Sequence, residues 1–144
     1  MKTLRLTLFL TTCFFILTAL EAQAAGLKIV SNNAAFTDQK VPTSMDKEHV
    51  YTISYTVKNT GDVIWKKGEC KLKVTVTPSD ISKDNKWLVP NTDLPNDVSP
   101  GSEVTLTFKV TAWNEDGTYS FQAQMMQNEV TFGSPSTAVS VNIN

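Results

Sequence analysis

The chain has 144 residues, and its 13 Lys and Arg against 14 Asp and Glu give a formal net charge of −1 at pH 7. A nearly neutral chain without a basic stripe does not favour binding to nucleic acid or to an anionic membrane surface. Its length fits one domain that closes a core without a metal or a disulfide.

The first residues have the pattern of a secretory signal peptide. Lys2 and Arg5 form a positively charged start, and an apolar run follows over residues 6–20. Ala22-Gln23-Ala24 is a small-x-small cleavage site. The run is too short for a stable membrane span. We therefore expect residues 1–24 to be cleaved and residues 25–144 to form one exported domain, periplasmic or extracellular. The absence of an Asn-x-Ser/Thr sequon favours a bacterial secretory route.

One cysteine would remain after this cleavage. Cys13 lies in the signal peptide, so Cys70 is left without an intramolecular disulfide partner. Cys70 shares strand parity with Leu72 and Val74, which favours a small buried hydrophobe. A reactive thiol, or one that pairs between molecules, is the alternative.

The residues after the signal peptide contain several stretches that alternate between apolar and polar, as β-strands do. We expect a short opening strand at residues 27–31 and then an irregular stretch, where Pro42 allows at most an edge strand broken into two pieces. Residues 50–59 and 71–78 alternate cleanly. Residues 79–99 form a long polar loop with a short strand near 87–89.

Residues 100–125 form the clearest pair of strands. Val104, Leu106 and Phe108 alternate with polar residues, and Tyr119 and Phe121 continue the alternation after a corner at residues 114–117. We expect these two strands to pair as a hairpin to which the others are added. Tyr119 stands where a tyrosine corner is found. Short strands at 130–132 and 137–143 complete the domain.

About seven or eight strands with turns between them, and no helical periodicity, predict an all-β fold. This pattern is typical of an immunoglobulin-like antiparallel β-sandwich.

An ordered set of motifs, spread over residues 34–134, carries a more specific likeness. The set comprises Val41-Pro42-Thr43, Asn59-Thr60-Gly61 followed by Trp65, Trp87, Val98-x-Pro100-Gly101, Phe108-x-Val110-x-Ala112, Gly117-Thr118-Tyr119-x-Phe121-Gln122 and Phe132-Gly133. It resembles the four-tryptophan (FW) immunoglobulin-like domain, known from a selective-autophagy cargo receptor and from bacterial exported proteins. The resemblance implies a protein-interaction or ligand-binding module without catalytic residues.

The chain departs from the pattern of that family at several positions. Only Trp65 and Trp87 match its tryptophans, Ala123 and Thr131 stand where further aromatic residues are expected, and Trp113 is additional.

Three residues are candidate ligand contacts. Trp113 continues the outward parity of Thr111, so it is either an exposed contact for a peptide or sugar, or it packs against Tyr119 or a neighbouring loop. Trp87, in the polar loop, either covers the sandwich or anchors a ligand. Met126 is expected to face outward as part of an adaptable surface. Trp65 keeps an inward parity and is expected in the core.

No pattern indicates catalysis, a metal or another cofactor. His49 is the only histidine, which rules out a histidine-rich metal site, and no zinc spacing is present. A Cys70–His49 pair lacks any nucleophile motif. The acidic residues of the long loop do not follow the D-x-D-x-D-G order of a calcium loop; they are Asp80, Asp84, Asp93 and Asp97.

The sequence leaves three functions open. The first is a non-catalytic exported module that binds a protein or peptide, by edge-strand addition or through the Trp87 and Trp113 loops. The second is a carbohydrate-binding module, favoured by aromatic residues in loops and a Thr- and Gln-rich surface. The third is a structural envelope or assembly protein whose edge strands pair with copies of itself.

Overall fold

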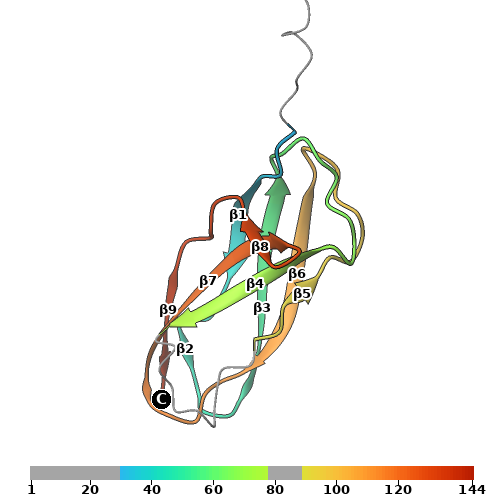
Figure 1. Ribbon diagram of the computed structural model, residues 1–144. Coiled ribbons are helices and arrows are strands. Elements are labelled where there is room, and N and C mark those ends of the chain that lie inside the picture. Colours follow the sequence, from blue (N-terminus) through green and yellow to red (C-terminus); the bar gives the residue numbers. More distant parts are fainter. Residues whose placement is uncertain (1–29, 78–88) are drawn as a thin grey trace, which may run out of the picture.

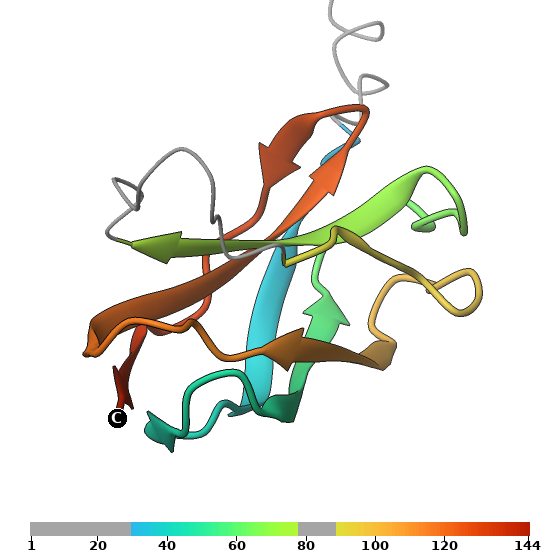
Figure 2. The ribbon, with the colours of Figure 1, turned by 90° about the horizontal axis from the view of Figure 1, so that it is seen from below.

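The computed structural model describes residues 30–77 and 89–144, which form a sandwich of two β-sheets (Figures 1 and 2). The expected signal peptide and Trp87 lie outside these residues. The strands are β1 (Ala34–Lys40), β2 (Ser44–Met45), β3 (Val50–Asn59), β4 (Cys70–Thr77), β5 (Thr92–Asp93), β6 (Glu103–Thr111), β7 (Gly117–Gln127), β8 (Val130–Phe132) and β9 (Val139–Ile143). The expected all-β, immunoglobulin-like sandwich is confirmed. The described residues contain no helix that is long and apolar enough to cross a membrane.

The smaller sheet has the order β1-β3-β6, and the larger has the order β2-β9-β7-β4-β5, with β8 paired to one end of β7. Every pairing between neighbouring strands is antiparallel except that of β2 with β9. The strand β3 has the bounds that the alternation predicts. Its Ile53, Tyr55 and Val57 are fully buried, because inward side chains of both sheets meet in one core.

The strands β6 and β7 do not form the expected hairpin. The strand β6 pairs with β3, whereas β7 lies in the opposite sheet between β4 and the pair β8 and β9. Alternation shows which face of a strand is buried, but it is the same whether the next strand lies beside it or across the core. The corner between them is nevertheless the expected tyrosine corner, because the Tyr119 hydroxyl donates to the Glu115 carbonyl oxygen at 3.4 Å.

The first described strand also differs from the expectation. No strand is present at residues 30–31, and β1 occupies part of the stretch expected to be irregular. A β-bulge between Phe36 and Asp38 breaks its alternation, which hid the strand in the sequence. The chain leaves this sheet near Pro42 and continues as β2 in the other sheet, so the edge strand is in two pieces as expected.

The core is built from apolar side chains of both sheets. Trp65 and Cys70 are fully buried, as expected, and burial raises the pKa of the Cys70 thiol. The Trp65 ring packs edge-on against Phe132, with ring centroids 5.6 Å apart. Its Nε1 donates to the side-chain oxygen of Asn32 at 2.8 Å, so the polar atom of the buried ring is satisfied.

The turn between β7 and β8 contains a strained residue. Asn128 and Glu129 both have positive φ, 50° and 64°, as a two-residue type I′ hairpin requires. Glycine adopts this conformation more readily than glutamate. We expect Glu129→Gly to raise the free energy of unfolding by roughly 0.5–1 kcal/mol in urea titrations. A loss of stability would contradict the strained turn, and Glu115→Gly, at an exposed position without a positive φ, is the control.

Candidate functional site

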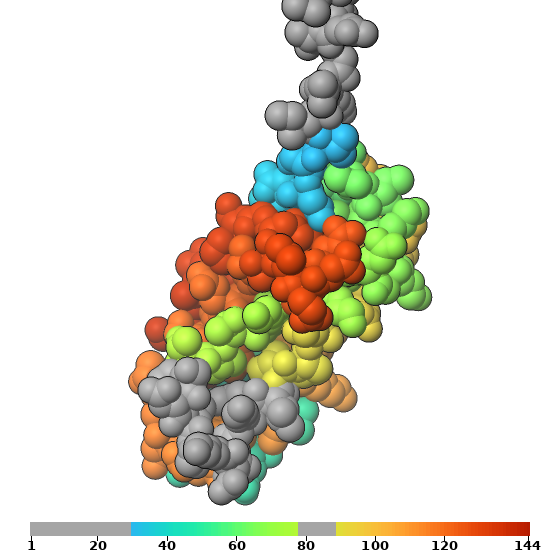
Figure 3. All heavy atoms as spheres, in the orientation of Figure 1, coloured from blue at the N-terminus to red at the C-terminus, as the bar shows by residue number. Residues whose placement is uncertain are grey.

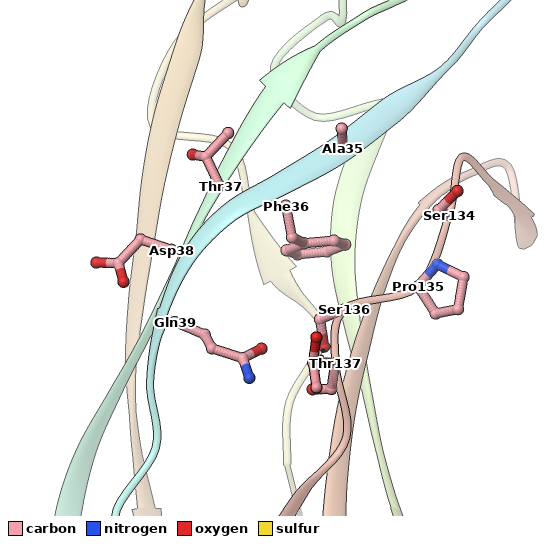
Figure 4. Close-up of a pocket in the computed structure, with 9 residues that line it drawn as sticks. All are labelled: Ala35, Phe36, Thr37, Asp38, Gln39, Ser134, Pro135, Ser136 and Thr137. Atoms are coloured by element: carbon pink, nitrogen blue, oxygen red, sulfur yellow. Dashed lines mark hydrogen bonds between the residues drawn. The ribbon is translucent and has the colours of Figure 1, made fainter.

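A cleft of about 410 Å³ opens between β1 and the segment of residues 134–137, which joins β8 to β9. Figure 4 shows these two walls facing each other. The lining residues are Ala35, Phe36, Thr37, Asp38, Gln39, Ser134, Pro135, Ser136 and Thr137. The cleft therefore lies at an edge of the sandwich where the two sheets separate.

Ser136 fixes one wall of the cleft, the segment of residues 134–137, to β7. Its backbone N–H donates to the Ala123 carbonyl at 2.8 Å, and its hydroxyl accepts from the Ala123 N–H at 2.9 Å. Gln122 and Gln124 add side-chain hydrogen bonds to the carbonyls of Ser136 and Gly133, at 3.0 and 2.8 Å. Ser136 is 3% exposed. The wall is thus a fixed part of the sheet, although it belongs to neither β8 nor β9.

The other wall is β1, and the edge of β1 that faces away from β3 is partly free. The Ala34 carbonyl accepts from the Ser134 N–H at 3.2 Å and joins the two walls at one end. Because alternate residues of an antiparallel strand direct their backbone groups to the same side, Phe36 also presents its N–H and C=O to the cleft. The pairing of Asp38 with Thr56 and of Lys40 with Ser54 gives Gln39 the same orientation.

The bulge in β1 sets the direction of its side chains. Thr37 and Asp38 are exposed, whereas Phe36 and Gln39 are half-buried and point toward the segment of residues 134–137 (Figure 4). Two side chains and the backbone of two residues therefore converge on the cleft from β1. The lining includes one ionisable residue, Asp38, which lies on the other side of the strand.

Tyr55 lies beneath the cleft. Its ring meets Phe36 edge-on with centroids 5.9 Å apart and stacks on Phe108 at 6.4 Å. The residue is fully buried, its hydroxyl has no hydrogen-bond partner among the described residues, and burial raises its pKa to about 12. The hydroxyl is therefore held neutral under Phe36.

This shift gives a prediction for alkaline solution. Between pH 10 and about 12 the unfolded chain ionises Tyr55 while the folded chain keeps it protonated, so stability falls as the pH rises. The loss amounts to roughly 3 kcal/mol over that window. Tyr55→Phe should remove this part of the loss in urea titrations at pH 9–12, and should leave stability at pH 7 unchanged or higher. Tyr51→Phe, at a half-buried tyrosine of the same strand, is the control; an equal or greater effect there would contradict the assignment.

The structure buries two of the predicted ligand contacts, which decides between the alternatives for Trp113 and corrects the expected exposure of Met126. Trp113 is 7% exposed and belongs to the hydrophobic core, which supports the packing interpretation over the exposed one. Met126 is 2% exposed, because it lies between Lys71 of β4 and Thr131 of β8, whose strands flank it on both sides. Neither residue lines the cleft. Ligand contact by Trp87 stays a prediction, since that residue lies outside the described part.

Two acidic residues of the long loop have cationic partners. Asp97 is 2.7 Å from Lys66, whose hydrogen bond lowers the pKa of this carboxyl, and Asp93 is 3.3 Å from Lys71. The described residues contain no cluster of three or more His, Cys, Asp or Glu side chains suited to a metal ion.

The residues that shape the site were not recognised from the sequence. Ser136 is a buried polar residue in a stretch that had the composition of a turn. Gln122 and Gln124 alternate outward, but their role depends on a segment more than eight residues further along the chain. No periodic signal marks such long-range side-chain to backbone bonds.

Two facing sheets, a first strand that changes sheet, and a tyrosine corner at a crossing between the sheets define an immunoglobulin-like domain. The family described as the Ig-like domain from next to BRCA1 gene matches residues 40–144, and the chain belongs to this family. A comparison with curated protein sequences finds no match.

Several solved structures share the fold. The CARDB domain of PF1109 from Pyrococcus furiosus, solved in complex with di-metal ions, is 18% identical, with a TM-score of 0.53 and coverage of 81% of this chain and 97% of that one. AvmM, which catalyses macrocyclization in alchivemycin A biosynthesis, is 11% identical with a TM-score of 0.58, covering 80% and 90%. Native alpha-2-macroglobulin from Escherichia coli is 14% identical with a TM-score of 0.51, covering 80% and 17%. At these identities the likeness shows the fold alone.

Proposed function

We propose that the protein is a non-catalytic, exported binding module of the FW type, which holds an extended segment of a protein partner against β1. The observation that carries the proposal is the cleft of about 410 Å³ beside a partly free strand edge. Its volume lies within the usual range of about 300–1,000 Å³ for ligand sites.

An extended peptide would use both kinds of group in the cleft. Its backbone would pair with the N–H and C=O groups of Phe36 and Gln39, which supplies affinity in β-strand addition. Its side chains would meet Phe36 and Pro135, which supply an apolar contact, and the hydroxyls of Ser134 and Thr137. The bond between Ala34 and Ser134 closes one end, so the peptide would enter from the Lys40 end of β1.

The composition of the cleft supports a binding role over a catalytic one. General acid–base catalysis needs a titratable side chain positioned in the site, and a hydroxyl nucleophile needs a group that activates it, such as an adjacent base. Asp38 is the one lining residue with an acidic or basic side chain, and it points away from the cleft. The motif order around Trp65 and Tyr119 supports the FW type, and the pattern of residues 1–24 supports export.

The test is a displayed library of random peptides selected against the folded domain. Gln39→Pro removes a backbone donor that faces the cleft, at an edge position where proline is tolerated. We expect it to weaken the selected peptides by about tenfold or more, since it also removes a side chain from the wall. The matched control is Thr107→Pro, which removes an outward donor from β6 at the other edge of the same sheet.

Circular dichroism would show that both variants keep the β-fold. Equal affinity of the two variants for the selected peptides, or a selection that yields no binder, would contradict the proposal. Binding of the same folded domain to a glycan array tests the carbohydrate-binding alternative.

A further inference from the structure

The strand β6 is the second edge of the smaller sheet, and it is long and regularly paired. All nine of its residues, Glu103–Thr111, are paired with β3 without a register shift. Among the described strands none is hydrogen-bonded to β6 on its other side (Figure 2), although β5 of the larger sheet lies near part of it. A regular free edge of this length readily pairs with another strand.

The register shows which backbone groups are free. The Ala112 N–H donates to the His49 carbonyl at 2.8 Å, and this pair continues the register of β3 with β6. Because backbone bonds alternate along an antiparallel strand, the even-numbered residues of β6 bond to β3. The odd-numbered residues therefore direct their N–H and C=O groups outward, and their side chains are exposed. These residues are Glu103, Thr105, Thr107, Lys109 and Thr111.

We propose that this edge pairs with the β6 edge of a second copy of the chain. The two β6 strands would run antiparallel about a two-fold axis at Leu106, which joins two three-stranded sheets into one of six strands. Such an interface is isologous, because both copies contribute the same surface. It leaves the cleft at β1 free, since β3 separates the two edges.

Charge complementarity selects this register and this occupant. With the axis at Leu106, Glu103 of each copy lies directly opposite Lys109 of the other, so two opposite-charge pairs form. Thr105 lies opposite Thr107 in the same arrangement. Opposite charges and threonine pairs at directly facing positions both stabilise antiparallel strands.

A neighbouring register lacks this match. With the axis at Thr107, Glu103 would face Thr111 and Lys109 would face Thr105, and no charge would be paired. Neither Glu103 nor Lys109 forms an ion pair within the described part of the chain. Lys58, the cross-strand neighbour of Glu103 on β3, adds a second positive charge beside that carboxylate. A lone lysine usually discourages pairing at an edge, but here a carboxylate stands at the matching position.

The test is a charge exchange read by sedimentation equilibrium over a concentration series. The wild type should form dimers. Glu103→Lys and Lys109→Glu should each weaken the dimer by about tenfold or more, because each places like charges opposite one another twice. The double variant restores opposite charges and should restore dimerisation to near the wild-type level. Lys58→Glu, on β3 and not at the edge, should have the smaller effect.

A wild type that stays monomeric at its highest soluble concentration would overturn the proposal. So would a dimer that both single variants leave unchanged, or a double variant no better than the singles. These results are separable from peptide binding at β1, which the single and double charge variants should retain. All these positions are exposed on the outer face, so the variants should fold.

Discussion

Replacing Asn59 with alanine should lower the free energy of unfolding by about 3–5 kcal/mol, because three hydrogen bonds of a buried side chain are lost together. The Asn59 side chain is fully buried. Its Nδ2 donates to the carbonyls of Val63 and Val98 at 2.7 and 3.0 Å, and its Oδ1 accepts from the Gly61 N–H at 3.0 Å. One side chain thus joins the end of β3 to two loops. Alanine cannot make any of these three hydrogen bonds.

Urea titrations of Asn59→Ala and Asn59→Asp would measure this effect. The aspartate variant should also be destabilised, since a carboxylate oxygen would face the two carbonyls in place of their donor. Asn91→Ala, at an exposed position, is the matched control and should change stability by at most about 0.5 kcal/mol. A similar small change in Asn59→Ala would show that the buried bonds do not organise these loops.

Trp113→Ala should cost about 3–5 kcal/mol, the range for removing a buried tryptophan. Trp113 is 7% exposed and lies in the loop that crosses from β6 to β7, within the core cluster. The expected loss of stability comes from the cavity that alanine would leave in the core, and it does not depend on a ligand. Thermal unfolding followed by circular dichroism measures it.

Trp113→Phe is the partner variant, and it should lose much less because most of the aromatic volume is kept. Peptides selected at the β1 cleft should bind Trp113→Phe as they bind the wild type. An unchanged melting temperature in Trp113→Ala, with loss of ligand, would instead return Trp113 to the role of an exposed contact.

Alternation in the sequence was sufficient to identify the main strands. It placed the inward residues of β3, β6 and β7 correctly, because burial on one face of a strand leaves a period of two. It does not decide which strands pair, so it predicts one hairpin for β6 and β7, although the two strands lie in opposite sheets. The bulge at Phe36 broke the period in β1 and hid that strand.

The candidate site was less accessible to sequence reasoning. Its walls are β1 and residues 134–137, which are about a hundred residues apart in the chain and meet in the folded sandwich (Figure 3). The aromatic residues of loops suggested a site, yet Trp113 is in the core. Polar residues such as Ser136 give no periodic signal, because their importance depends on the partner that the fold supplies.

Hydrogen exchange of the backbone amides, with and without a peptide selected from the library, tests the binding cleft most directly. The amides of Phe36 and Gln39 face the cleft, and bound peptide should slow their exchange by tenfold or more while those of Thr105 and Thr107 stay unchanged. Protection confined to β6 or to residues 112–117, with none on β1, would contradict the account.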